Sequence, residues 1–172
     1  MTKASIKRKY LILVILTTLV ILLDQFTKNL VLEKFHLGES LTVFSGFFDL
    51  TYIRNTGAAF GILAHADPTF RVPFFIIVPL LALFAIGYIF KKLPENDIKV
   101  SLALSLIVGG AIGNLIDRIY LGFVVDFLDF HWQNQYHFPA FNVADSAICI
   151  GVGLLMLDLS VKEKQANVST TS

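Results

Sequence analysis

Two aspartates in apolar surroundings are the first residues of this sequence whose type and placement could do chemistry. Asp126 lies in GFVVDF between bulky apolar side chains, and Asp145 lies in FNVADSAI at the beginning of an apolar run. Apolar surroundings disfavour the charged form of a carboxyl group and therefore raise its pKa. Two carboxyl groups that share a site can hold one proton between them, so that one activates water and the other donates a proton. The pair indicates hydrolysis of the aspartic-protease kind, which requires no metal.

Further polar residues lie inside apolar segments, where an ionisable side chain marks a functional site by default. On a helix, Asn114 and Asp117 share a stripe with Gly110, because they follow it at i+4 and i+7. Asn142 shares a face with Asp145 at i, i+3. If the two stripes face each other, Asp145 meets polar groups instead of lipid. The other polar candidates in or beside these apolar segments are Asp24, Lys28 and Arg118.

A purely structural role stays open for all of these residues at this point. The acids could cap helices, or they could pair with Lys28 and Arg118 only to hold the helices together. Spacing alone does not separate this reading from a catalytic one.

The composition places these residues in a membrane protein. Hydrophobic residues make up 55% of the 172 residues and charged residues 16%, and the mean hydropathy is +0.70, which is not typical of soluble domains. The net charge of +1 gives no basic field that would indicate nucleic acid. We expect one domain over residues 1–162 and a polar, disordered tail over 163–172. Four apolar segments are each close to the roughly 20 residues that cross a bilayer as a helix, and they are 10–31, 72–90, 100–119 and 141–159.

Lysine and arginine in the short flanks of these segments predict the orientation of the chain. Basic residues cluster before the first segment, around the turn KKLPEND between the second and third, and after the fourth. With four spans these three flanks lie on one side of the membrane, so both termini are expected to be cytoplasmic. The segments 33–71 and 120–140 then face outward, and the polar residues of three spans come to the same outer level.

The two outer segments have different patterns. LTVFSGFFDLTYIR has β-branched and aromatic residues around Gly46, which predicts a small pair of strands. FHWQNQYHF mixes aromatic residues with histidine, which suits an aromatic belt at the lipid headgroups. Asp126 is expected in a loop of the second outer segment.

Five motifs occur in the order found in bacterial lipoprotein signal peptidases, the signal peptidase II family, which the chain resembles from Tyr10 to Leu159. They are DQFTK with Asp24 and Lys28, NTGAAFG with Asn55, Gly57, Ala58 and Ala59, GGAIGNLIDR with Gly110, Gly113, Asn114, Asp117 and Arg118, VVDF with Asp126, and FNVAD with Phe141, Asn142, Ala144 and Asp145. Five motifs in order on a chain with four spans make the resemblance specific.

The resemblance implies an all-α membrane protein of four transmembrane helices with a small extracytoplasmic β-rich cradle. It implies an intramembrane aspartic endopeptidase, without cofactor or metal, that removes the signal peptide from diacylglyceryl-modified prolipoproteins just before the lipidated cysteine. The implied location is the bacterial cytoplasmic (inner) membrane, with the active site on the side of the outer leaflet. The implied partners are prolipoprotein substrates and membrane lipid, and no nucleic acid; we expect a monomer.

The resemblance also implies roles for individual residues. By motif position the catalytic pair is Asp126 and Asp145. The residues implied to hold the substrate or to orient the acids are Asn55, Gly57, Asn114, Arg118 and Asn142. The residues implied to brace the outer ends of the helices are Asp24, Lys28 and Asp117.

Other functions would use some of the same residues. A small proton-coupled transporter also needs intramembrane acids and an arginine, but its polar residues would extend through the full depth of the membrane. A Ser–Lys peptidase would need a serine beside Lys28, and neither Ser45 nor Ser146 has a marked context. A metalloprotease is disfavoured because the four histidines are scattered and form no H-E-x-x-H motif. The single cysteine, Cys149, is expected to be a small buried residue.

Overall fold

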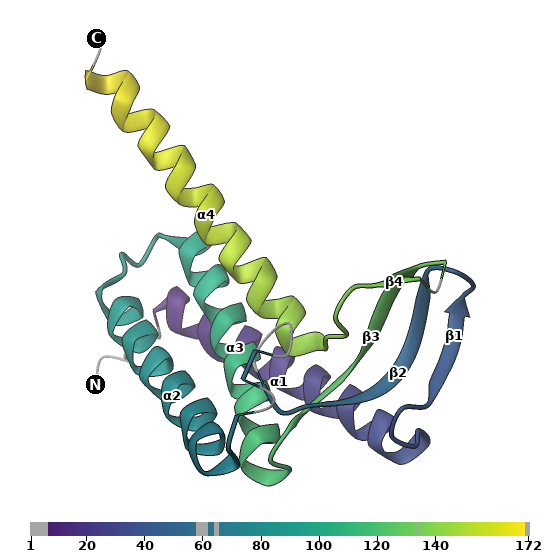
Figure 1. Cartoon of the computed structure of the whole chain (residues 1–172). Helices are drawn as coiled ribbons and strands as arrows, with labels where there is room; N and C mark the ends of the chain where they lie inside the picture. Colours follow the sequence, from purple (N-terminus) through teal and green to yellow (C-terminus); the bar gives the residue numbers. More distant parts are fainter. Residues whose placement is uncertain (1–6, 58–61, 64–65, 134, 171–172) are drawn as a thin grey trace.

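Four long helices form the body of the protein, and a small sheet extends from one side of it (Figure 1). A computed structural model describes residues 7–57, 62–63, 66–133 and 135–170, with side chains as far as residue 162. The helices are α1 (Arg8–Lys34), α2 (Pro68–Lys92), α3 (Ile98–Tyr120) and α4 (Val143–Thr170). Each is long and apolar enough to cross a membrane, which confirms the predicted set of four apolar helices.

The central helix of the bundle is α3, which packs against each of the other three helices. Its glycines allow this close approach. A Cβ atom at Gly109 would lie 2.8 Å from the Cβ of Val20 in α1, and one at Gly113 would lie 2.6 Å from Oδ2 of Asp24. Gly110 in turn lies against the carbonyl oxygen of Ala144 in α4. The small residues of GGAIG therefore serve contacts within the chain.

The helix ends are fixed by short polar contacts. Asp67 precedes the Pro68 at the beginning of α2, and its carboxylate accepts a hydrogen bond from the backbone N–H of Thr69 at 2.8 Å, as an N-cap does. At the other end of α2, the buried Lys9 of α1 donates to the carbonyl oxygens of Phe90 at 3.1 Å and Leu93 at 2.6 Å. These contacts set where α2 begins and ends, and they tie its C-terminus to the beginning of α1.

The sheet has four antiparallel strands in the order β1-β2-β3-β4. They are β1 (Ser40–Phe44), β2 (Phe48–Asn55), β3 (Val124–Trp132) and β4 (Tyr136–His137). The first two form a hairpin whose turn contains Gly46 at φ +76°, which confirms the predicted strand pair. Tyr52, Val125 and Phe127 of this sheet pack on Val31 of α1 and anchor it to the bundle.

The expectation that Asp126 lies in a loop is wrong, because Asp126 lies in β3 opposite Ile53 of β2. The aromatic segment FHWQNQYHF likewise supplies the end of β3 and the strand β4. β2 and β3 are separated in sequence by α2 and α3, and a pairing between distant segments leaves no local signal in either one. The cradle is thus larger than the hairpin that the sequence predicts.

The last helix is longer than the predicted span. α4 is helical as far as Thr170, whereas the sequence predicts disorder from residue 163. Lys, Glu, Gln and Ala dominate KEKQA at the start of that stretch, and these residues favour helix once a preceding helical turn has nucleated it.

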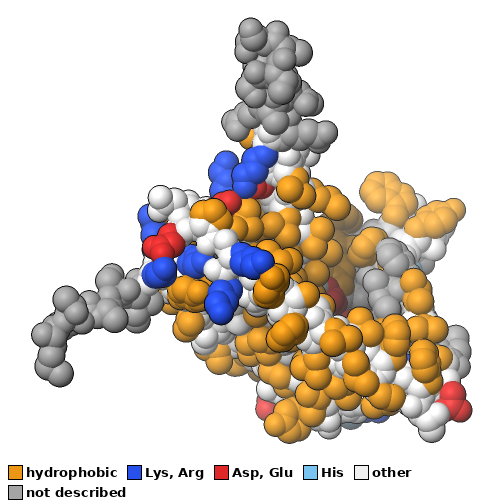
Figure 2. All heavy atoms as spheres, turned by 90° about the vertical axis from the view of Figure 1, so that its left-hand side faces the viewer, with side chains coloured by type: hydrophobic (Ala, Val, Ile, Leu, Met, Phe, Trp, Pro, Cys, Tyr) orange, Lys and Arg blue, Asp and Glu red, His pale blue; other side chains and the backbone are white. Residues whose placement is uncertain are grey.

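Charged and apolar side chains occupy different parts of the surface. Figure 2 shows Lys and Arg side chains gathered near the two ends of the chain, beside a broad hydrophobic face. Exposed basic residues at the beginning of α1, the end of α2 and the beginning of α3 are Lys7, Arg8, Lys91, Lys92 and Lys99. The apolar face includes Leu81 and Phe84 of α2, which are 64% and 79% exposed. Such exposure of large apolar side chains on a long helix is expected for a lipid-facing surface.

Candidate active site

Asn142 connects the two aspartates that the sequence singles out. Its Nδ2 donates to Oδ1 of Asp126 at 2.7 Å, and its Oδ1 accepts from the backbone N–H of Asp145 at 2.9 Å. The carboxylate of Asp145 reaches back to the backbone N–H of Asn142 at 3.4 Å. Asn142 immediately precedes α4, so these reciprocal contacts form a capping box at the beginning of that helix. The side chain of Asn142 therefore caps α4 and, through the same contacts, holds Asp145 beside Asp126.

Asp126 lies almost completely out of solvent, with 2% of its surface exposed. Besides Asn142, it accepts a hydrogen bond from Nδ2 of Asn55 at 3.0 Å. Burial raises the pKa of Asp126 from its ordinary value of 3.8 to about 7, and the nearby charge of Asp145 acts in the same direction. The Asp126 carboxyl is therefore able to hold a proton near neutral pH.

Asp145 lies in the first turn of α4 and is held from α3. Nδ2 of Asn114 donates to Oδ1 of Asp145 at 2.7 Å. The Asn114 side-chain oxygen accepts from Nζ of Lys28 at 2.9 Å and from Nδ2 of Asn142 at 3.2 Å. Because both neighbours are donors, the Asn114 amide group can only point its own N–H groups at Asp145. The polar stripes of α3 and α4 thus face each other.

Three further candidates form a buried charged cluster next to Asn114. Nζ of Lys28 lies 2.8 Å from Oδ2 of Asp24 and 3.0 Å from Oδ2 of Asp117. All three side chains are at most 3% exposed. Gln25 is not among the residues predicted from the sequence, and it donates from Nε2 to Oδ1 of Asp117 at 2.9 Å.

Arg118 and Gly57 lie at one side of the two acids. Nη2 of Arg118 donates to the carbonyl oxygen of Gly57 at 3.1 Å, and its guanidinium lies 5.1 Å from the ring centre of Phe75 in α2. Arg118 is close enough to Asp145 and Asp126 to interact electrostatically with both. The backbone N–H of Gly57 donates to Oδ1 of Asn55 at 3.0 Å. Because Asn55 also donates to Asp126, its side chain connects the loop after β2 to the Asp126 carboxyl. Ala58 and Ala59 of the same motif lie outside the described residues.

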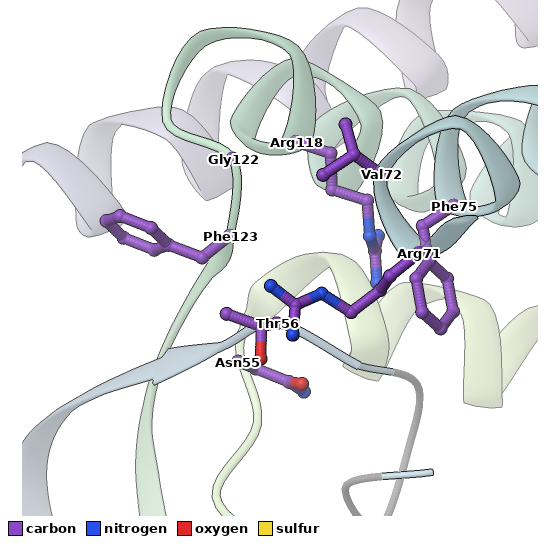
Figure 3. Close-up of a pocket in the computed structure, with 8 residues that line it drawn as sticks. All are labelled: Asn55, Thr56, Arg71, Val72, Phe75, Arg118, Gly122 and Phe123. Carbon is purple, nitrogen blue, oxygen red and sulfur yellow. The ribbon is translucent and has the colours of Figure 1, made fainter. Parts of the chain in front are cut away.

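Arg71 of α2 lies near the site and, unlike Arg118, is not among the residues predicted from the sequence. Figure 3 shows its side chain extending from α2 toward Thr56, in a small pocket that Asn55 and Arg118 also line. Nothing in the local sequence indicates that this arginine lies beside the site, since basic residues are common where a transmembrane helix meets the interface.

A cavity of about 690 Å³ opens in front of the acids. Its polar wall contains Asp126, Asp145 and Asn114, together with Asn55 and Arg118. Its apolar wall is formed by β2, β3, the connection to α4 and the second turn of α4, and it includes Ile53, Val124, Phe138, Pro139, Ala140, Phe141 and Ile148. A cavity with apolar walls and a few convergent polar groups is typical of a binding site for a small or lipid-like group.

Cys149 is also part of this cavity wall. It is exposed, so the expectation that it is a small buried residue is wrong. α4 turns this position toward the opening in front of the acids, and hydrophobicity alone does not distinguish that side of a lipid-exposed helix from its buried side.

The chain matches known proteins over most of its length. The family profile described as Signal peptidase (SPase) II matches residues 16–161. The lipoprotein signal peptidase of Syntrophotalea carbinolica is 52% identical over 149 residues, which cover 87% of this chain and 91% of that protein. The lipoprotein signal peptidase of Geobacter metallireducens is 49% identical over 159 residues, which cover 92% of this chain and 96% of that protein. A solved structure of a bacterial membrane enzyme superposes with a TM-score of 0.80 at 36% identity, covering 89% of this chain and 90% of that one.

Proposed function

The chain belongs to the signal peptidase II family of aspartic peptidases and cleaves signal peptides from prolipoproteins, and we propose that Asp126 and Asp145 are its catalytic pair. The observation that carries this proposal is the single buried side chain of Asn142, which hydrogen-bonds the Asp126 carboxyl and the Asp145 backbone. It holds two acids from different elements at one cavity. The family identity leaves the transporter alternative without support.

The two acids have different tasks at rest. Asp126 is the protonated member, because burial raises its pKa to about 7. The side chain of Asp145 accepts N–H donors from Asn114 and the backbone of Asn142, and we assign it the role of the base. A carboxylate beside an acid that keeps its proton is the arrangement that allows one group to act as base and the other as acid.

The reaction then follows with every proton accounted for. Asp145 takes a proton from a water molecule, whose oxygen attacks the scissile carbonyl carbon, while Asp126 gives its proton to the carbonyl oxygen. The product of this step is a neutral tetrahedral diol. As the C–N bond breaks, Asp145 transfers its proton to the leaving amine and one hydroxyl of the diol returns a proton to Asp126. Both acids recover their starting state.

The surrounding residues support this chemistry. Asn55 and Asn114 each donate one hydrogen bond to a carboxyl group and so fix its rotation. Arg118 faces the cavity beside the acids, close enough to interact electrostatically with both Asp145 and Asp126. The carbonyl of Gly57 accepts from Arg118 and keeps the guanidinium in place.

The substrate is a diacylglyceryl-modified prolipoprotein, which is cut just before its lipidated cysteine. The form of the cavity supports this assignment, because its carboxyl groups and its apolar wall lie side by side. The acyl chains of such a substrate stay in hydrocarbon while the cysteine lies near the headgroups, so the scissile bond reaches the polar wall as the lipid meets the apolar wall.

The orientation supported by the charges has both termini in the cytoplasm. The basic side chains gather at the end of the bundle that carries the beginning of α1 and the connection from α2 to α3 (Figure 2). Lys and Arg are enriched in short cytoplasmic flanks. The acids then lie on the opposite side, at the outer leaflet of the bacterial inner membrane, and the chain acts there as a monomer.

A cleavage assay tests the assignment of the pair. Purified protein in detergent is incubated with a diacylglyceryl-modified prolipoprotein, and the shorter product is quantified. Asp126→Asn and Asp145→Asn are each expected to lower the rate by a factor on the order of 10²–10⁴, the range for loss of a general acid or base. Asp129→Asn is the matched control, because Asp129 lies in the same strand but pairs with His137; it should cleave at the wild-type rate. A folded Asp126→Asn or Asp145→Asn protein with near wild-type activity would remove that residue from the mechanism.

A further inference from the structure

The buried cluster around Lys28 contacts the backbone at two corresponding places. Oδ1 of Asp24 accepts a hydrogen bond from the backbone N–H of Ala144 at 2.9 Å. Oδ2 of Asp117 accepts one from the backbone N–H of Val125 at 3.0 Å. Ala144 and Val125 are the residues immediately before Asp145 and Asp126. Each carboxylate partner of Lys28 therefore holds the backbone N–H of the residue that precedes one of the two acids.

A third contact reaches an acid through one side chain. Lys28 donates to the side-chain oxygen of Asn114 at 2.9 Å, and the amide nitrogen of Asn114 donates to Asp145 at 2.7 Å. An ammonium group has three N–H donors and no acceptor. Its three donors are thus all directed at groups that hold the acids.

From these contacts we propose that the Lys28 ammonium is the spacer that sets the separation of the Asp126 and Asp145 carboxyl groups, as a positioning residue that does not touch the substrate. This inference rests on the proposed function, in which the two aspartates are the catalytic pair. Lys28 is absent from the cavity wall, so it acts from behind the acids.

The location of the cluster explains why a spacer is needed. Asp126 is carried by β3 and Asp145 by α4, and these elements are joined by a connection that lines the cavity. Lys28 and Asp24 belong to α1, whereas Asp117 and Asn114 belong to α3. The ammonium lies where α1 and α3 meet, so it ties the backbone before each acid to these two helices.

Stability alone is a weak reason for this arrangement. Lys28, Asp24 and Asp117 are 2%, 0% and 3% exposed. The free-energy cost of removing such buried charges from water offsets much of their mutual attraction. Well-packed apolar side chains of similar volume are often as stabilising as a buried ion pair. The geometry that the charges impose on the acids is a gain that apolar packing would not supply.

The charge of Lys28 also acts on the acid that holds the proton. Its positive charge lowers the pKa of Asp126, against the larger raising effect of burial and the raising effect of Asp145. Arg118 of α3 also interacts electrostatically with Asp126, and β2 contributes the neutral Asn55. Removing the Lys28 charge should therefore raise the pKa of Asp126 further.

The test compares two lysines of α1. In Lys28→Met we expect kcat to fall at least tenfold with KM within about twofold of wild type, because a small displacement of catalytic groups slows the chemical step without removing substrate contacts. The fall in rate at alkaline pH should also move to higher pH. Lys9→Met is the matched control: Lys9 is 4% exposed and donates three hydrogen bonds, but all go to carbonyls at the end of α2. It should lower the melting temperature and leave kcat and the pH profile unchanged.

A second variant separates spacing from charge. Lys28→Arg keeps the positive charge, but its donors are spread over a plane and do not radiate from one atom. We expect kcat to fall at least tenfold while the alkaline fall stays at the wild-type pH, and this variant is the one to measure if Lys28→Met does not fold. Wild-type kcat per folded molecule in Lys28→Arg, or a Lys28→Met protein that behaves like Lys9→Met, would overturn the inference. If instead Asp126→Asn and Asp145→Asn remain active, the proposed catalytic pair itself has failed, whatever the Lys28 variants do.

Discussion

The backbone of Gly110 in α3 lies directly against the carbonyl oxygen of Ala144 in α4. Ala144 is fully buried and its own N–H is held by Asp24, so the first turn of α4 has no room to shift without moving Asp145. A close contact between α3 and α4 and the position of Asp145 are therefore set at the same point.

We expect Gly110→Ala to reduce cleavage strongly, because an added Cβ would displace the first turn of α4 and with it Asp145. The rate and the melting temperature of the purified variant measure this effect. Gly153→Ala is the matched control, since Gly153 is in α4 but has no atom within 4 Å of the added Cβ. It should keep wild-type activity and gain some stability, as replacing glycine in a helix does. Equal activity of the two variants would contradict the packing argument.

Cys149 offers a chemical test of the cavity. It is the only cysteine of the chain, it is exposed, and it lines the cavity with Asp126 and Asp145. Alkylation with a bulky maleimide should abolish cleavage by filling the apolar wall, and preincubation with a lipidated substrate should slow the labelling. Cys149→Ser should remain active and resist the reagent. Full activity of a completely alkylated wild-type protein would mean that the substrate does not use this cavity.

Trp132 reports where the sheet lies relative to the membrane. It is the only tryptophan of the chain, 63% exposed at the end of β3, close in sequence to Tyr136, which is 75% exposed. If these aromatic residues lie at the headgroups, as aromatic belts do, brominated lipids should quench Trp132 in vesicles most strongly when the bromine is near the interface. Emission typical of full water exposure, without quenching by any brominated lipid, would place the sheet away from the membrane.

Much of the site could be predicted from helical spacing. The sequence places Asn142 and Asp145 at i, i+3 and Asn114 on the polar stripe of another helix. In the structure the Asn114 side chain contacts the side chains of both Asp145 and Asn142. Spacing works for Asn114 and Asp145 because each lies in a long, regular helix, in which position along the chain fixes the direction of the side chain. Asn142 lies just before α4 and reaches Asp145 as the cap of that helix.

The placement of Asp126 could not be predicted in the same way. It depends on the pairing of β3 with β2, whose register places Asp126 opposite Ile53 and Val124 opposite Asn55. These residues are far apart in sequence, and nothing local in VVDF specifies its partner strand. The contacts of Asp24 with Ala144 and of Asp117 with Val125 are hidden for the same reason, since each joins a helix side chain to the backbone of another element.

The pH dependence of kcat/KM for the wild-type enzyme tests the central claim, that two acids share one proton in this site, most directly. Burial raises the pKa of Asp126 from 3.8 to about 7, so the group keeps its proton at pH 5–6 and loses it as the pH rises through about 7. Because that proton is needed for the carbonyl oxygen of the substrate, kcat/KM should fall about tenfold per pH unit above this value. Two results would contradict the account: a value of kcat/KM that stays constant well above pH 7, or one that already falls around the ordinary aspartate pKa of 3.8.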